Sequence, residues 1–186
     1  MNRFHFLETG LSGLWVAERT RLEDARGFLS RVFCAREFAQ TGLRDPIVQI
    51  NHTCTRGPGT VRGMHLQFPP HAETKVVSCL RGEVFDVAVD LRKGSPSLLR
   101  YHAEILSADN RRALVIPPGF AHGFQVLGGD CELLYLHTAP YVPAAEGGVG
   151  PADPRVGIDW PLEVRGLSER DRSHPPLSAD FEGIPL

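Results

Sequence analysis

The chain has 186 residues, of which 42% are hydrophobic and 23% charged, the composition of an ordinary globular protein that can bury its core in one domain, residues 1–186. Its 20 basic and 22 acidic residues leave a formal net charge of −2, which argues against a nucleic-acid-binding protein that relies on bulk positive charge. No apolar run approaches the roughly 18 residues of a membrane span, and the N-terminus has no signal-peptide pattern, so we expect a cytoplasmic protein without membrane contact.

Short apolar and β-branched runs follow one another along the chain, separated by Gly, Pro, Asn and Asp. This punctuation predicts an all-β sandwich or barrel of many short strands. The strands are expected, in chain order, at residues 14–17, 28–33, 47–53, 61–67, 75–81, 83–91, 98–106, 113–116, 123–127 and 132–137. A helix is expected at 34–41, ended by Gly42, and a short helical turn at 167–172, capped by Ser168. The Gly/Pro-rich segment 147–154 is predicted to be a loop.

Several of these strands carry polar side chains on one face. Gln49, Asn51 and Thr53 alternate along one predicted strand, and Tyr135 and His137 share a face of another. Inward polar groups of a barrel are costly unless they are paired or used. A ligand cavity inside the barrel would explain them, and exposure to solvent at a sheet edge would explain them equally well.

His65 lies in the predicted strand segment Arg62-Gly63-Met64-His65-Leu66-Gln67. A histidine beside arginine and glutamine indicates a proton-transfer group that faces a polar ligand, although one hydrogen bond would also satisfy it as a core residue. Strict alternation places Arg62 on the opposite face to His65. If both reach one ligand, the strand must bulge at Gly63, or Arg62 must lie at the strand's mouth.

A second histidine, His122, ends the pattern P-x-G-x-x-H, which resembles the second motif of the cupin superfamily, small β-barrels of jelly-roll type. The other motifs occur in a fixed order: Arg26-Gly27-Phe28, Gln49-x-Asn51-His52, Arg62-Gly63-x-His65-x-Gln67, the run 82–96, Glu132-x-x-Tyr135, Tyr141, Glu146 and Ile158-x-Trp160-Pro161. Over residues 26–171 the chain resembles the dTDP-4-dehydrorhamnose 3,5-epimerase family.

The resemblance implies a cupin-type jelly roll with a few short helices, and an enzyme that acts on a nucleotide-linked 4-keto-6-deoxy sugar without a metal or other cofactor. It implies that His65 is the general base, Asp171 its partner and Tyr135 the proton donor on the other side of the sugar. The substrate-binding positions that it implies are Arg26, Arg31, Gln49, Asn51, Arg62, Lys75, His122, Tyr141, Glu146 and Arg170. A homodimer formed by exchange of N-terminal strands is also implied, with no nucleic acid as a partner.

The implied reaction is chemically coherent. A ketone at carbon 4 acidifies the protons on carbons 3 and 5, because the resulting carbanion delocalises into an enolate. Inversion removes a proton from one face of the sugar ring and returns one to the other, so two proton-transfer groups are needed, and His65 and Tyr135 suit these roles. Lys75 is the candidate donor to the enolate oxygen. The planar guanidinium groups of the arginines suit a pyrophosphate.

Two departures from the family pattern concern substrate recognition. Arg31 occupies a position at which the family usually has glutamate, in a segment that the family contributes to the nucleotide site across the dimer. This charge reversal leaves the identity of the nucleotide base open. Arg170 replaces the lysine that usually precedes the aspartate, which keeps the charge but changes its geometry.

Other interpretations remain open at the level of sequence. Asp86 is a rival partner for His65. A metal-dependent cupin would use His65 and His122 as ligands, but the H-x-H run usual in such cupins is absent here. A catalytically silent sugar-binding cupin would not need His65, Tyr135 and Asp171 together. An enzyme that inverts carbon 3 alone is not separated by sequence from one that inverts carbons 3 and 5.

Overall fold

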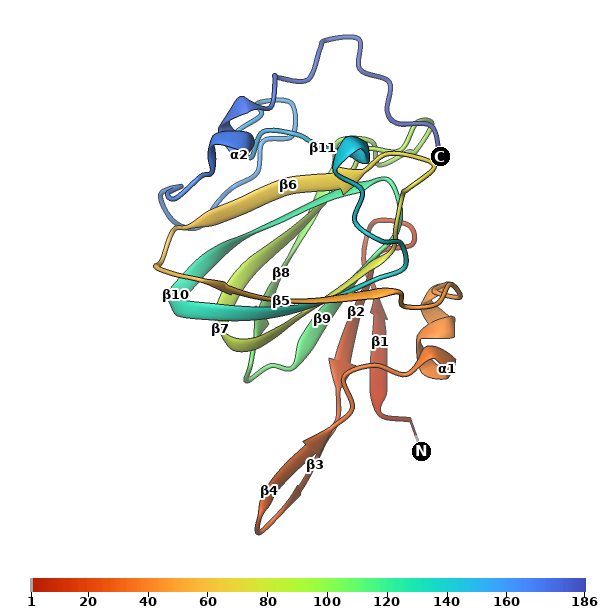
Figure 1. Ribbon diagram of the computed structural model, residues 1–186, viewed down its shortest axis with the longest axis vertical. Helices are drawn as coiled ribbons and strands as arrows, with labels where there is room; N and C mark the ends of the chain where they lie inside the picture. The colour runs from red at the N-terminus through yellow and green to blue at the C-terminus, as the bar shows by residue number, and fades with distance from the viewer. Residues whose placement is uncertain (1) are drawn as a thin grey trace.

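The structure, a computed structural model, describes residues 2–186 and consists mainly of antiparallel strands (Figure 1). The strands are β1 (Phe4–Glu8), β2 (Trp15–Arg19), β3 (Arg21–Asp24), β4 (Gly27–Ser30), β5 (Gln49–Thr55), β6 (Val61–Gln67), β7 (Lys75–Asp90), β8 (Tyr101–Ser107), β9 (Arg112–Ile116), β10 (Phe120–His137) and β11 (Glu146–Gly148). The helical segments are α1 (Ala35–Phe38), η1 (Ala39–Thr41), η2 (Pro143–Ala145) and α2 (Glu169–Ser173). The predicted all-β class is confirmed, and the single domain stays a prediction.

Two long strands, β7 and β10, pair with each other and run through both layers of the fold. The first part of β7, residues 75–78, pairs with β9, whereas residues 83–89 pair with β8. In β10, residues 122–125 pair with β6 and residues 131–137 pair with β5. One layer therefore contains β1, β2, β9 and β5, the other contains β8, β6 and β11, and both share β7 and β10.

The bend of β7 lies at Gly82, and it explains why one strand was predicted as two. Gly82 has a φ of +76°, and a Cβ on it would lie 2.6 Å from the carbonyl oxygen of Asp130 on β10. Only glycine fits such a close approach with positive φ. The β7–β10 ladder continues through this bend with register shifts between Val126 and Leu133. The two predicted strands 75–81 and 83–91 therefore belong to the single strand β7, and 123–127 and 132–137 belong to the single strand β10.

The hydrophobic core positions the C-terminal segment against the outer side of β6. Val149, Val156 and Ile184 are buried with Met64 and Leu66 in one cluster. Burial of apolar side chains of this size is worth roughly 1.5–3 kcal/mol each. The segment that leads into α2 is therefore held beside β6, and Figure 1 shows α2 next to one end of that strand.

The local helix predictions are confirmed. The predicted helix 34–41 consists of α1 followed by η1, and Gly42 ends it with a φ of +87°. Ser168 is the N-cap of α2, and its hydroxyl accepts a hydrogen bond from the Asp171 backbone N–H at 3.1 Å. No helix among residues 2–186 combines the length and the apolar character that a membrane span requires.

One strand prediction and one loop prediction are wrong in part. The segment 28–33 contributes only to the short strand β4, which forms a separate hairpin with β3. The loop predicted at 147–154 begins inside β11, which pairs with β6 so that Gly148 lies opposite His65. Neither element shows the apolar alternation of a half-buried strand, and β11 is only three residues long.

Candidate active site

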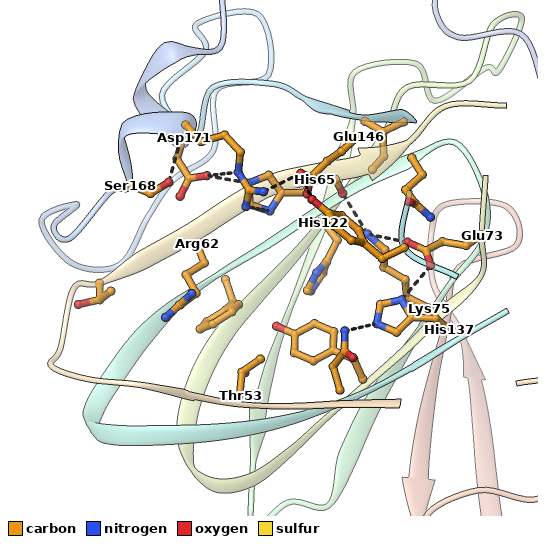
Figure 2. Close-up of a pocket in the computed structure, with 18 of the residues that line it drawn as sticks. Thr53, Arg62, His65, Glu73, Lys75, His122, His137, Glu146, Ser168 and Asp171 are labelled. Atoms are coloured by element: carbon orange, nitrogen blue, oxygen red, sulfur yellow. Dashed lines mark hydrogen bonds and ion pairs between the residues drawn. The ribbon is translucent and has the colours of Figure 1, made fainter. Parts of the chain in front are cut away.

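A cavity of about 420 Å³ lies between the two layers, within the range of small-molecule sites (Figure 2). Its lining residues are Asn51, Thr53, Thr60, Arg62, His65, Leu66, Gln67, Glu73, Lys75, His122, Phe124, Tyr135, His137, Tyr141, Glu146, Gly166, Ser168, Arg170 and Asp171. Asn51 and Thr53 of β5 and Tyr135 and His137 of β10 thus line a cavity, as expected for a ligand site inside the barrel, whereas Gln49 lies outside its lining.

His65 and Asp171 form a hydrogen-bonded pair on one wall of this cavity. The Nε2 atom of His65 lies 2.6 Å from Oδ1 of Asp171, whose side chain is only 2% exposed. Burial lowers the pKa of His65 below 6.5 although Asp171 opposes that shift, and Arg170 lowers it further. Burial disfavours the charge of Asp171, but its hydrogen bond with His65 outweighs this and lowers the Asp171 pKa. The pair is therefore a neutral imidazole beside a carboxylate, with Nδ1, which lies 3.5 Å from an Arg170 nitrogen, as the unprotonated nitrogen.

A bulge in β6 brings Arg62 to the same cavity as His65. His65 lies opposite His122 and Arg62 opposite Phe124, so three steps on β6 face two steps on β10. Arg62 donates from Nε to the hydroxyl of Thr55 at 2.8 Å. Of the two expected arrangements, a bulge at Gly63 or Arg62 at the strand's mouth, the register shows the bulge, which lets both side chains line one cavity.

His122 has its own carboxylate partner. Its Nε2 atom lies 3.0 Å from both oxygens of Asp86, which is fully buried. Burial raises the pKa of Asp86, although the interaction with His122 opposes that rise. Asp86 is therefore the partner of His122, and the alternative in which it pairs with His65 is wrong.

Tyr135 lies on the part of β10 that pairs with β5, in the layer opposite to β6. Burial, followed by the nearby Asp86, raises the pKa of its phenol well above 10.0. A phenol in this state keeps its proton at neutral pH and is suited to donate it. Thr53, on the strand β5 that pairs with this part of β10, lies across the cavity from His65 in Figure 2.

A buried ionic cluster lies at the end of the cavity beside Lys75. The Lys75 ammonium is 3.4 Å from Oε1 of Glu73 and 3.3 Å from the backbone oxygen of His65. The other oxygen of Glu73 is 2.8 Å from Nδ1 of His137. Burial lowers the pKa of Lys75, and Glu73 opposes this. The sequence does not predict Glu73 as a site residue, and for His137 its alternation with Tyr135 is the one available signal.

The predicted binding residues Gln49, Tyr141, Glu146 and Arg170 meet at the rim. Tyr141 donates its hydroxyl to Glu146 at 2.9 Å and its backbone N–H to the side-chain oxygen of Gln49 at 2.9 Å. Arg170 donates to the same Glu146 carboxylate at 2.6 Å and lies 3.5 Å from Nδ1 of His65. The rim therefore connects the wall of β5 with the wall of His65.

Arg26 and Arg31 lie outside the cavity of their own chain. Arg26 is at the exposed tip of the β3–β4 hairpin, where it pairs with Asp24 at 2.6 Å. Arg31 follows β4 and pairs with Glu37 of α1 at 2.6 Å. Their predicted contact with substrate is not made within one chain and stays a prediction.

One cluster of side chains near the cavity has ligand atoms close enough for a metal ion. His65, Asp171 and His174 offer atoms that all lie within 4.8 Å of one another. Two of these atoms are already joined by the short His65–Asp171 hydrogen bond. The sequence-based alternative of a metal-dependent cupin paired His65 with His122, and His122 does not belong to this cluster.

Comparison with known proteins identifies relatives of this chain. A profile of the dTDP-4-dehydrorhamnose 3,5-epimerase family matches residues 8–179. The 3,5-epimerase of Methanothermobacter thermautotrophicus is 40% identical over 95% of this chain and 96% of its own length. The dTDP-4-dehydrorhamnose 3-epimerase of Streptomyces niveus is 36% identical, over 88% of this chain and 79% of its own length.

Among solved structures, the dTDP-6-deoxy-D-glucose-3,5-epimerase of Legionella pneumophila, in complex with dTDP-4-keto-L-rhamnose, is similar with a TM-score of 0.90. It shares 36% sequence identity, and the match covers 97% of this chain and 98% of that one. This likeness confirms the expected cupin-type jelly roll. The family profile, the relatives and the fold agree, and the chain belongs to the dTDP-4-dehydrorhamnose 3,5-epimerase family.

Proposed function

We propose that this protein epimerises carbons 3 and 5 of dTDP-4-dehydro-6-deoxy-D-glucose and so forms dTDP-4-dehydro-L-rhamnose. The observation that carries the proposal is the His65–Asp171 pair, 2.6 Å apart, on the wall of a cavity that Tyr135 also lines. The Legionella relative was solved with dTDP-4-keto-L-rhamnose, the compound proposed here as the product.

His65 is the proposed base. Asp171 accepts the hydrogen bond from Nε2, so the lone pair of Nδ1 is available to remove a proton from the sugar. The imidazolium that forms is stabilised by the Asp171 carboxylate, as in other histidine–carboxylate pairs. A positioned base of this kind contributes about 10²- to 10⁴-fold to the rate.

Tyr135 is the proposed acid. It lies in the layer opposite to His65, and its buried phenol remains protonated at neutral pH. A sugar ring held between the two layers would therefore face His65 on one side and Tyr135 on the other. Loss of a proton to His65 and gain of a proton from Tyr135 inverts the carbon between them.

Lys75 is the proposed stabiliser of the enolate. Its side chain is 12% exposed and lies in the same cavity as His65 and Tyr135. A fixed charge in a water-poor cavity stabilises a developing oxyanion more than it would in water. Arg62 and Arg170 are the proposed partners of the pyrophosphate, because their guanidinium groups pair with its oxygens in a planar geometry.

Proton NMR of the substrate in heavy water tests the reaction directly. Deuterium should enter carbons 3 and 5 in the presence of the protein and should fail to do so with His65→Ala. His52→Ala is a matched control, because His52 pairs with Glu132 at 3.0 Å on the exposed face of β5. Folded wild-type protein that exchanges neither proton would contradict the proposal.

A second candidate is inversion of carbon 3 alone. The relative from Streptomyces niveus, which is named a 3-epimerase and is 36% identical to this chain, supports inversion of carbon 3 alone as a candidate. The same experiment separates the two, because a 3-epimerase would exchange the proton of carbon 3 and leave that of carbon 5 in place.

We also propose a homodimer in which the β3–β4 hairpin packs on a second copy. The hairpin extends away from the two layers (Figure 1) and exposes 59% of Phe28 and 69% of Leu29. The outer face of β5 exposes 60% of Ile50, so both surfaces are apolar. This arrangement would bring Arg26 and Arg31 toward the partner's cavity and its nucleotide.

Light scattering coupled to gel filtration tests the dimer. Wild-type protein should elute with the mass of two chains, and Leu29→Asp should elute as one. Wild-type protein with the mass of one chain at micromolar concentration would overturn this arrangement. Leu186→Asp is the control, because Leu186 is 62% exposed at the C-terminus, away from the hairpin.

A further inference from the structure

Four hydrogen bonds in series connect Glu73 to the backbone of Tyr141. Glu73 Oε2 lies 2.8 Å from His137 Nδ1, and His137 Nε2 lies 3.4 Å from Asn51 Nδ2. Asn51 Oδ1 is 3.3 Å from Gln49 Nε2, and Gln49 Oε1 is 2.9 Å from the backbone nitrogen of Tyr141. Figure 2 shows Glu73 and His137 at the Lys75 end of the cavity.

The groups at the two ends of this series determine which residue donates and which accepts in each hydrogen bond. The Tyr141 backbone N–H can only donate, so Gln49 must turn its oxygen toward Tyr141 and its amide nitrogen toward Asn51. Asn51 must then accept through its oxygen and donate through its nitrogen to His137. His137 must therefore accept at Nε2 and carry its proton on Nδ1, which donates to the Glu73 carboxylate. A proton on Nε2 would place two donors face to face.

We propose that Glu73 and His137 are positioning residues, which orient the amides of Asn51 and Gln49 and hold Lys75 in the cavity. This inference rests on the proposed function, since it concerns how the same site binds its substrate. With the series in this direction, Asn51 keeps its second amide hydrogen free for a ligand atom. Together with the Lys75 ammonium, it makes this wall a donor surface for the oxygens of a ketosugar.

Glu73 has a second contact that ties the series to Lys75. Its Oε1 atom lies 3.4 Å from the Lys75 ammonium, while its Oε2 atom accepts from His137. The side chains of Glu73, His137 and Lys75 are 6%, 11% and 12% exposed. A buried lysine without a partner is costly, so the same carboxylate keeps Lys75 charged and fixes the tautomer of His137.

Two substitutions of His137 separate the two halves of its role. The side-chain amide of glutamine occupies the place of Nε2, so His137→Gln retains an acceptor for Asn51 and loses the donor to Glu73. The amide of asparagine occupies the place of Nδ1, so His137→Asn retains that donor and loses the acceptor. His137→Asn should raise KM by about tenfold, because the Asn51 amide loses the acceptor that orients it, with a smaller change in kcat, whereas His137→Gln should stay within about threefold of wild type.

The matched control is His52→Asn, which removes a histidine that pairs with a glutamate on the outer face of the same strand as Asn51. Nitrogen-15 NMR of labelled wild-type protein reports the tautomer without any substitution, and a proton on Nδ1 of His137 at neutral pH is expected. A proton on Nε2, or equal KM values for wild type and both His137 variants, would overturn the inference. A wild-type protein that does not turn over substrate would instead refute the proposed function, and the NMR result would still decide the tautomer.

Discussion

Gly63 and Gly123 face each other across the β6–β10 ladder with no room for a side chain on either. A Cβ on Gly63 would lie 2.5 Å from the Cα of Gly123, and a Cβ on Gly123 would lie 2.5 Å from the Sδ of Met64. This contact lies at the bulge that turns Arg62 and His65 toward one cavity. The two glycines therefore support the site without touching a ligand.

Gly123→Ala should consequently lower both stability and activity. Overpacking of this kind costs about 1–3 kcal/mol, and relief of the clash would displace the bulge and His65 with it. Thermal unfolding and kcat/KM measure the two effects. Gly128→Ala on the same strand is the control and should resemble wild type, because within residues 2–186 no heavy atom beyond Gly128 and its two chain neighbours lies within 4 Å of its Cβ position. Equal behaviour of the two variants would refute the role of the contact.

Asp171→Asn should reduce kcat by about 10²- to 10⁴-fold with little change in folding. An amide at this position cannot stabilise the imidazolium, and its nitrogen would favour the wrong tautomer of His65. Turnover and thermal unfolding should be compared with Glu169→Gln, an exposed residue of the same helix. Wild-type turnover in Asp171→Asn would exclude the pair from the mechanism.

Tyr135→Phe should slow reprotonation more than deprotonation. The variant retains His65 and the ring but has no phenolic proton, so solvent exchange at the sugar should continue while the inverted product is formed more slowly. Deuterium incorporation and product composition are measured in one NMR time course. An unchanged ratio and rate of products would show that another group donates the proton.

Arg170→Gln should move the acid limb of kcat/KM to higher pH. Burial and the Arg170 charge both lower the pKa of His65, which keeps the base neutral below pH 6.5. Removing the positive charge raises that pKa, so His65 becomes protonated, and inactive as a base, at a higher pH than in wild type. Arg172→Gln on the same helix should leave the limb in place. A shift to lower pH would contradict the assignment.

Asp90→Asn should destabilise the fold at neutral pH. Burial disfavours the charge of Asp90, but hydrogen bonds from Arg92, Ser95 and Ser97 outweigh this and lower its pKa from 3.8 to about 2. A depressed carboxyl pKa stabilises the folded state above the unfolded pKa, and this contribution of about 2 kcal/mol is lost as the pH falls toward 2. Urea unfolding should show a difference at pH 7 that narrows between pH 4 and pH 2. Asp45→Asn, in an exposed loop, should show none.

The parts of the site that could be predicted depend on local signals. The Ser168 cap places Asp171 in the first turn of α2, and alternation places Tyr135 and His137 on one face. A bulge at Gly63 is one of the two arrangements expected once Arg62 and His65 are assigned to one ligand, and the ladder contains it. The remaining site residues could be assigned only from the order of the family motifs, because no local sequence pattern predicts that α2 lies beside β6.

The parts that could not be predicted depend on register between distant segments. Glu73 reaches His137 because Lys75 lies opposite His137 in the β7–β10 ladder, a pairing across 62 residues that alternation does not determine. The strand β11 is recognisable only from its partner β6. Whether Arg26 and Arg31 reach substrate depends on a second copy of the chain.

The continuity of β7 and β10 through both layers has a consequence for substrate entry. Because the same two strands belong to both walls, the walls cannot separate like a hinge without breaking the backbone ladder between them. Differences in sugar size must instead be accommodated by side chains and by the rim of the cavity. There β5 and β11 are each hydrogen-bonded to a neighbouring strand along one edge only, and Tyr141 connects them through Gln49 and Glu146. New substrate preferences in this scaffold should therefore arise at the rim, while the spacing of the walls stays constant.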